Sequence, residues 1–433
     1  MEKPGTTQNE EKAVSVVPAP KPIDPRTLPQ EERKGGLYSV LSVEHPLNKM
    51  KKSNVYYDWQ DGLRLYNPDK TEHKVFIKTA DNIVLYNGMW KDEWLVLDRK
   101  NYIETDFFID DEEVKFDLKG MKVLVTTPEG TVGDAISWFQ YAERFQQKTE
   151  CELYWNSSEW MKDVFGKEYP NITFLQRKEA EERNKEWMAI YRLGLFFDPL
   201  TEQNPYEVFN HRYVGLGTGA AYELDVDPSY IPPRVPKMPR DETVPKEKYV
   251  TIASQASAQC KRWNNGAGWD TVCKYLKEKG YRVLSIDLNR VEEFKGHINQ
   301  IPWESEDYTG PHPFLERIRL MQHAEFHIGL SSGLSWLCWC AGTPCVLISG
   351  FTMPITEWPN PYRVWNKIGC NGCWNKFPWD GKNFRFCPKD KDFECTRMIT
   401  PVRVIEVIER LRKDIEDGKV CSYGSSVAKQ DGN

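Results

Sequence analysis

The sequence lacks three features that would each place it in a particular class of protein. The N-terminus carries no apolar segment of the kind found in signal peptides. No run approaches the roughly 20 apolar residues that a membrane-spanning helix needs. Positive charge is not in excess either, since 58 Lys and Arg stand against 64 Asp and Glu and the net charge is −6. We therefore expect a cytoplasmic protein with no membrane span and no general basic surface for nucleic acid.

Cysteine, in contrast, is abundant and clustered. Eleven cysteines without a signal sequence predict reduced thiols instead of a disulfide framework. Four of them follow the spacing C-x2-C-x13-C-x7-C, which is typical of a tetrahedral metal site: Cys370, Cys373, Cys387 and Cys395. Thiolates bind iron or zinc, and spacing does not decide between them. Because no ligand position is left for substrate, we predict one structural metal and no catalytic metal.

The first part of the chain divides into two segments of different composition. Residues 1–36 are rich in Pro, Lys, Glu and Gln, and we expect them to be disordered. Residues 37–119 predict a small all-β module, because short β-rich segments alternate with turn signals. The expected strands are Asn54–Trp59, Leu63–Tyr66, Lys74–Lys78, Ile83–Asn87, Glu93–Asp98 and Val114–Leu118, and the turn signals are Asp61-Gly62, Asn67-Pro68-Asp69 and Asn87-Gly88.

The rest of the chain alternates between strand and helix patterns twice. Residues 120–240 and 241–433 each predict a Rossmann-like domain with a parallel sheet, and Pro-rich text over 227–245 predicts the linker between them. The fold class is therefore α/β, a pair of Rossmann-like domains facing each other, with the β module before them and the metal finger (370–395) inside the second. Ligands of such folds bind at the carboxyl ends of the strands.

One βαβ unit, residues 323–352, has the pattern of a phosphate-binding site. A strand (Glu325–Gly329) is followed by the turn Leu330-Ser331-Ser332-Gly333, a helix (Leu334–Ala341) and a second strand (Pro344–Ser349). Unpaired N–H groups at the helix N-terminus can hold phosphate, and Ser331, Ser332 and Ser335 add hydroxyl groups. An ordinary serine-capped turn has the same pattern.

Two further segments carry groups suited to transfer chemistry. Gly133-Asp134 begins the first helix of the first domain, expected over Ile136 to Phe145, where the helix dipole keeps a carboxylate ionised as a general base requires. A strand ending at Ala253 leads into Ser254 and then Lys261-Arg262-Trp263. Hydroxyl groups and a lysine suit a diphosphate, although Asp134 also fits a helix-capping role and Lys-Arg pairs are commonly solvated.

These segments together resemble the bacterial autotransporter heptosyltransferases, relatives of the lipopolysaccharide heptosyltransferases. The resemblance rests on Gly133-Asp134, on Lys261-Arg262-Trp263, on GLSSGLSWLCWCAGTP followed by Gly350-Phe351-Thr352, and on the four cysteines. It covers the chain from the β module to the last helix. The turn departs from the lipopolysaccharide enzymes, which read approximately Asp-Thr-Gly-Leu-x-His, because Ser331, Ser332 and Trp336 stand at the acidic, hydroxyl and imidazole positions.

The resemblance implies a GT-B fold and inverting transfer of heptose from ADP-heptose to serine hydroxyl groups of an autotransporter adhesin. It also implies iron in the cysteine finger and a large homo-oligomer. Asp134 would be the base and Lys261 the diphosphate contact. The nucleotide-sugar site would comprise Ser254, Lys261, Trp263, Ser331, Ser332, Gly333, Phe351 and Thr352.

Three other interpretations stay open from the sequence. The chain could be an enzyme of the same fold acting on a lipopolysaccharide acceptor, a zinc-ribbon protein that binds nucleic acid, or a catalytically idle scaffold. The acidic net charge disfavours the nucleic-acid interpretation.

Overall fold

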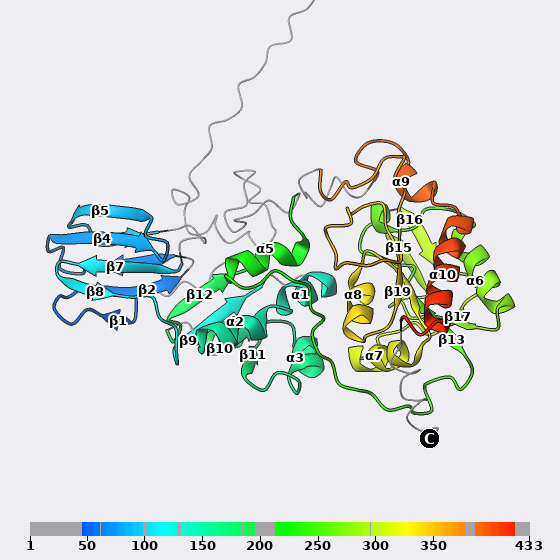
Figure 1. The fold of residues 1–433 in the computed structure, drawn as a ribbon, viewed down its shortest axis with the longest axis horizontal. Coiled ribbons are helices and arrows are strands. Elements are labelled where there is room, and N and C mark those ends of the chain that lie inside the picture. The colour runs from blue at the N-terminus through cyan, green and yellow to red at the C-terminus, as the bar shows by residue number, and fades with distance from the viewer. Residues whose placement is uncertain are drawn as a thin grey trace, which may run out of the picture.

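A computed structural model of the chain describes residues 46–97 except 61, 103–127, 131–194 except 184, and 213–420 except 295 and 377–385. Two α/β units lie side by side, and a further β-sheet lies at the outer side of the first unit (Figure 1). The segment predicted to be disordered, 1–36, lies outside the described residues, as do 37–45 and part of the cysteine finger. Within the described part, no helix has both the length and the apolar character that crossing a bilayer requires.

The first unit contains the predicted parallel βα alternation. Its strands run in the order β11-β10-β9-β12, and their side chains are largely buried because helices cover the sheet. The elements are β9 (Lys122–Thr126), α1 (Val132–Phe139), α2 (Ala142–Thr149), β10 (Glu152–Asn156), α3 (Glu159–Phe165), β11 (Ile172–Leu175), α4 (Arg177–Glu182), β12 (Ala189–Arg192) and α5 (Leu216–Glu223).

The single helix expected over Ile136 to Phe145 is wrong, because the chain forms two helices there. The carbonyl oxygen of Ser137 accepts a hydrogen bond from the side-chain amide of Gln140 at 2.7 Å. The N–H of Tyr141, which would bond that carbonyl in a continuous helix, donates to Trp138 instead. A side chain that competes for a backbone acceptor in this way ends α1.

The N-terminal segment is rich in strands, as the sequence predicts, and some of these strands continue the sheet of the first unit. Strand β2 pairs in parallel with β12, so β2, β3, β6 and β1 extend the sheet of the first unit, and β5-β4-β7-β8 form a second, antiparallel sheet. Covering β12 removes an exposed sheet edge. The bounds are β1 (Asn48–Lys49), β2 (Tyr56–Gln60), β3 (Leu63–Tyr66), β4 (His73–Thr79), β5 (Val84–Trp90), β6 (Trp94–Val96), β7 (Thr105–Ile109) and β8 (Glu112–Val114).

Two local predictions in this region are wrong. Asn87-Gly88, expected as a turn, lies inside β5, which continues to Trp90. Strand β7 was not expected, and the strand predicted over Val114–Leu118 ends at Val114. The bounds of these strands follow from their pairing: β5 and β7 pair with β4, and β8 pairs with β7. Pairing of this kind is not a local property of the sequence.

The second unit has an all-parallel sheet in the order β17-β14-β13-β18-β19-β20. Residues 227–245, predicted as the linker, contain no helix or strand. The elements are β13 (Tyr249–Ile252), the 3₁₀ turn η4 (Gln259–Lys261), α6 (Gly268–Glu278), β14 (Arg282–Ser285), the hairpin β15 (Val291–Phe294) and β16 (His297–Gln300), β17 (Glu306–Asp307), α7 (Phe314–His323), β18 (His327–Leu330), α8 (Gly333–Cys340), β19 (Cys345–Ile348), β20 (Arg363–Val364), α9 (Glu394–Arg397) and α10 (Pro401–Glu416).

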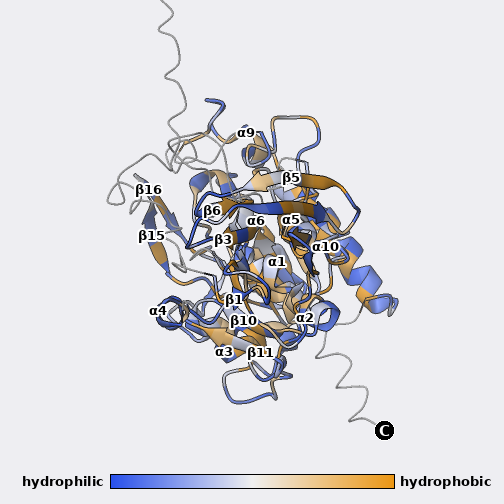
Figure 2. Ribbon diagram, turned by 90° about the vertical axis from the view of Figure 1, so that its left-hand side faces the viewer, coloured by the Kyte–Doolittle hydropathy of each residue, from blue (hydrophilic) through white to orange (hydrophobic). Residues whose placement is uncertain are grey.

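The C-terminal helix α10 closes this unit. Thr400 caps it by accepting a hydrogen bond from the N–H of Arg403, and proline occupies its first turn. Hydrophilic and hydrophobic residues alternate along it (Figure 2). The buried face is Val404, Val407, Ile408 and Leu411, whereas Val402 is exposed.

Candidate functional site

Asp134 lies in the first turn of α1, at the carboxyl end of β9. Its Oδ2 accepts a hydrogen bond from the Thr131 hydroxyl at 2.7 Å and a longer one from the Thr131 N–H at 3.3 Å. Burial raises the pKa of the Asp134 carboxyl above its ordinary value, while the Lys261 ammonium and these hydrogen bonds oppose the rise. Asp134 therefore caps the helix, and it is also a half-buried carboxyl group with a raised pKa, a property that a general base can have.

The N-terminus of α1 lies against the N-terminus of α8 in the second unit. A Cβ on Gly133 would lie 2.7 Å from the Trp336 ring, and a Cβ on Gly333 would lie 2.6 Å from Cβ of Val132. Only glycine at these two positions allows so close an approach. The βαβ turn of one unit is thus brought next to the carboxylate of the other.

Lys261 comes from η4, after β13. Its ammonium is close enough to Asp134 to lower the pKa of that carboxyl, lies 3.3 Å from the Ser257 hydroxyl, and is 5.8 Å from the centre of the Phe351 ring. Asp134, Lys261 and Phe351, which the sequence predicts as site residues from three distant segments, therefore lie in one neighbourhood. A carboxylate and an ammonium so placed suit proton removal beside a developing negative charge.

The hydroxyl groups of the predicted turn have different roles. Ser332 is the N-cap residue of α8, is half-buried, and its hydroxyl makes no hydrogen bond to another described residue. The Ser335 hydroxyl donates to the carbonyl oxygen of Leu330 at 2.6 Å, so it closes the turn. Only Ser332, with the N–H groups that follow it at the helix N-terminus, is placed to receive a ligand.

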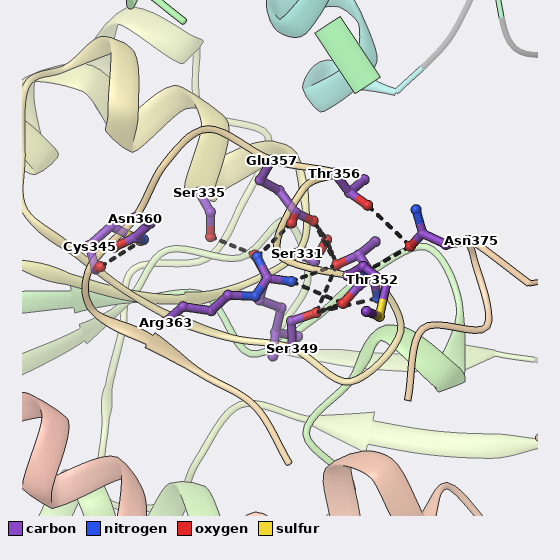
Figure 3. Close-up of polar contacts among 12 residues, drawn as sticks. Ser331, Ser335, Cys345, Ser349, Thr352, Thr356, Glu357, Asn360, Arg363 and Asn375 are labelled. Atoms are coloured by element: carbon purple, nitrogen blue, oxygen red, sulfur yellow. Dashed lines mark hydrogen bonds and ion pairs between the residues drawn. The ribbon is translucent and has the colours of Figure 1, made fainter. Parts of the chain in front are cut away.

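Ser331 and Thr352 point into the protein, toward a buried carboxylate (Figure 3). The Ser331 hydroxyl donates to Oε1 of Glu357, and the Thr352 hydroxyl lies 2.7 Å from the same atom. Arg363 forms a 2.6 Å ion pair with Oε2 of Glu357. The two predicted residues thus shape their loops from inside, and Glu357 and Arg363 are site-related residues that the sequence analysis missed.

At the end of β13, Ser254 is held by a second missed carboxylate. Asp287 accepts hydrogen bonds from the N–H of Ser254 at 2.8 Å, from its hydroxyl at 3.0 Å, and from the N–H of Gln255 at 3.1 Å. Burial raises the pKa of Asp287 although these bonds oppose the rise. Asp287 lies just after the carboxyl end of β14, the edge of the sheet where ligands bind in such folds, so its position was a signal that could have found it.

Trp263 does not face a ligand. Its side chain is 4% exposed, its indole N–H donates to the carbonyl oxygen of Ile399 at 2.9 Å, and its ring packs against Trp269. It is part of the hydrophobic core of the second unit, and we leave it out of the site.

The four predicted metal ligands lie close to the Phe351 loop. The N–H of Gly372 donates to Gly350, and the N–H of Trp374 donates to Phe351, so the Cys370–Cys373 segment is bonded to the loop after β19. A Cβ on Gly350 would lie 2.8 Å from Cβ of Cys395. The cysteine segment therefore supports one wall of the site.

The thiols are neighbours, but they do not converge. Burial first, and neighbouring thiols second, raise the pKa of Cys373 to about 11 and that of Cys395 to about 12. Among the described residues, no three His, Cys, Asp or Glu side chains lie closely enough together to hold a metal ion. The donor chemistry fits a metal, yet an ion would have to draw the thiols closer, so the structure does not confirm the metal finger.

Comparison with known proteins decides the family. Residues 222–377 match the model of "Glycosyltransferase family 9 (heptosyltransferase)". The chain is 40% identical over 373 residues to autotransporter heptosyltransferase Aah of Escherichia coli, which covers 83% of this chain and 93% of that protein. The chain belongs to the autotransporter heptosyltransferases.

Two other members of the family are informative about activity. The crystal structure of dodecameric, iron-containing heptosyltransferase TibC, in complex with ADP-D-β-D-heptose, matches with a TM-score of 0.80 and 36% identity over 86% of this chain and 99% of that chain. TibC comes from enterotoxigenic E. coli H10407. The inactive autotransporter heptosyltransferase BimC of Burkholderia thailandensis is 30% identical over 374 residues, 83% of this chain and 86% of that protein.

For an autotransporter heptosyltransferase, a GT-B-like pair of facing α/β units is the expected architecture, and the two sheets described above agree with it. The base candidate comes from the first unit, and the lysine and the helix N-terminus come from the second.

Proposed function

We propose that this chain transfers heptose from ADP-heptose to serine hydroxyl groups of an autotransporter adhesin, with inversion at the anomeric carbon. The observation that carries the proposal is the placement of Asp134 opposite Lys261 and beside the N-terminus of α8. The choice of heptose as the sugar and of an autotransporter as the acceptor is supported by membership of the autotransporter heptosyltransferases.

In the proposed reaction, one group removes a proton from the acceptor and the others stabilise the leaving diphosphate. The Asp134 carboxylate removes the proton of the serine hydroxyl while that oxygen forms a bond to the anomeric carbon. The bond from that carbon to the diphosphate oxygen breaks on the opposite face, and ADP leaves with the electron pair. Lys261 and the N–H groups at the start of α8 stabilise the negative charge that develops on the diphosphate. Donors fixed in advance stabilise this charge without reorganising during the reaction.

We infer one structural metal per chain, held by Cys370, Cys373, Cys387 and Cys395. Iron is the first choice, in line with iron-containing TibC, and zinc is the alternative for the same thiolate set. When bound, the metal would supply folding free energy to the segment that supports the Phe351 loop, and no step of the transfer needs it.

We also infer a large homo-oligomer that works in the cytoplasm, as dodecameric TibC suggests for the assembly. The four-stranded sheet leaves β5 as an edge strand, and the side chains of Val84 and Met89 on it are more than half exposed. Apolar side chains on an open edge favour association with another chain.

Mass spectrometry of a candidate adhesin co-expressed with this chain tests the function. We expect heptose-sized mass increments on serine residues, and none with the empty vector. Transfer to lipopolysaccharide core with an unmodified adhesin would favour the lipopolysaccharide-type alternative. Normal folding with neither product would make the chain an idle relative like BimC. Salt-sensitive binding to nucleic acid would instead support the zinc-ribbon alternative.

The pH dependence of the reaction tests the pairing of Asp134 with Lys261. Asp134 acts as a base only when ionised, so kcat/KM falls as the pH drops toward its raised pKa. The Lys261 ammonium lowers that pKa, so Lys261→Met should raise it and move the acid limb of the pH–rate profile to higher pH. Lys277→Met, which removes an exposed lysine on α6, is the matched control and should leave the limb in place. If the acid limb does not move in Lys261→Met, Lys261 does not act on the ionisation of Asp134, and the proposed pairing of the two residues is wrong.

A further inference from the structure

We propose that Glu357 and Arg363 are positioning residues that hold the two donor-facing loops at a set distance from each other. One loop is the turn before α8, which carries Ser331. The other follows β19 and carries Thr352. The inference rests on the proposed function, because it assigns these loops to the nucleotide-sugar donor.

The carboxylate of Glu357 joins the two loops directly (Figure 3). Its Oε1 accepts from the Ser331 hydroxyl and from the Thr352 hydroxyl, which also lies 3.0 Å from the Ser331 hydroxyl. A carboxyl oxygen has two lone pairs and can accept both bonds at once. The same atom therefore anchors a side chain from each loop.

Arg363 forms an ion pair with this carboxylate, and it adds a second link to the Thr352 loop. Its Nη1 lies 2.6 Å from Oε2 of Glu357, and its Nη2 donates to the carbonyl oxygen and the hydroxyl of Thr352, at 3.1 and 3.0 Å. Arg363 begins β20, the edge strand next to β19, so a rigid element holds the guanidinium.

The burial of both side chains indicates that the ion pair between Glu357 and Arg363 adds little to the stability of the fold. The Glu357 and Arg363 side chains are 1% and 6% exposed. Removing two charges from water costs about as much as their attraction returns, so an apolar pair of similar shape would stabilise the fold as well. The pair does what an apolar pair does not, since it binds hydroxyl groups from both loops in a fixed geometry.

The neighbours of the two anchored residues show what that geometry controls. Ser331 precedes Ser332, the N-cap residue of α8, and Thr352 follows Phe351, whose ring lies under Lys261. The distance between the loops therefore sets how far the helix N-terminus lies from the Phe351 ring that contacts Lys261, and the helix N-terminus and Lys261 are the two groups that contact the diphosphate in the proposed mechanism. Asn375 holds the far side of the second loop by accepting from the N–H of Met353 and the hydroxyl of Thr356.

Three variants, Glu357→Gln, Arg363→Met and the double variant, test this role, with ADP binding by calorimetry, donor KM and kcat, and thermal unfolding as readouts. Each single variant leaves one buried charge or donor set without its partner, so we expect a lower Tm and ADP affinity weakened about tenfold or more. The double variant removes both charges. We expect its Tm to recover toward wild type while ADP affinity stays weak and the donor KM stays raised.

Asp58→Asn is the matched control, because it breaks another buried carboxylate–arginine pair, with Arg64, far from the donor loops. It should lower Tm and leave ADP affinity unchanged. Recovery of both Tm and ADP affinity in the double variant would show a purely structural pair and overturn the inference, as would wild-type ADP affinity in the single variants. A wild-type chain that does not bind ADP would overturn the proposed function itself, and with it the donor loops.

Discussion

Asp134→Asn is expected to lower kcat by about 10²- to 10⁴-fold while ADP affinity stays at the wild-type value, because general-base catalysis contributes a factor of that size. Asparagine keeps an oxygen that can accept the hydrogen bond from the Thr131 hydroxyl, so the helix cap is retained and only the base is lost. This makes asparagine a sharper test than alanine, which would remove both. The measurement is single-turnover transfer of heptose to an adhesin fragment at saturating ADP-heptose, together with calorimetry of ADP.

Glu179→Gln is the control for Asp134→Asn. Glu179 stands at the same position in the first turn of α4 and accepts a hydrogen bond from the N–H of Gln176 at 2.8 Å, as Asp134 does from Thr131. Its replacement should change neither kcat nor ADP affinity. If Asp134→Asn kept more than about a tenth of the wild-type kcat, Asp134 would be a capping residue and not the base.

Cys395→Ser is expected to release the metal from the purified chain and to weaken ADP binding about 100-fold. The metal content should fall from one per chain toward zero, since loss of a thiolate removes one of four ligands. The effect on ADP follows from the contacts of the segment, because it packs on Gly350 and is bonded to Phe351. Misplacement of a binding loop by about 1 Å can cost a factor of 100. Elemental analysis and calorimetry of ADP measure the two effects separately.

Cys273→Ser is the control for Cys395→Ser. Cys273 is buried in α6, away from the four clustered thiols, so its replacement should leave the metal content unchanged. A Cys395→Ser chain that kept a full complement of metal would refute the ligand assignment. A metal-free chain that bound ADP normally would instead show that the cysteine segment does not support the donor loop.

The elements that the sequence predicts well are those whose signal is local. The parallel βα pattern of both units is correct, because the helices bury one face and repeat their apolar residues at the helical period, whereas the strands are buried on both faces and stand out as short apolar runs. Residues that follow these strands, among them Asp134, Ser254 and Ser332, could be proposed as site residues from the same pattern, since carboxyl ends of parallel strands meet at one edge of a sheet.

The features that the sequence did not predict depend on contacts between residues that are distant in the sequence. The N-terminal strands joined the first unit because β2 pairs with β12, more than a hundred residues later, and no local pattern encodes that pairing. The neighbours of Trp263 in the sequence predict a ligand contact, whereas its indole N–H donates a hydrogen bond to the carbonyl oxygen of Ile399 in the core.

By itself, the sequence determined the two α/β units, the clustered thiols, the acidic charge and the resemblance to the autotransporter heptosyltransferases. Tertiary structure alone decided that Lys261 stands opposite Asp134, that two glycines let α1 and α8 meet, and that Glu357 and Arg363 hold Ser331 and Thr352 from within. The physical reason is that periodicity and capping act between residues a few positions apart. A buried charge instead finds its partner only after the chain has folded and desolvation has made an unpaired group costly.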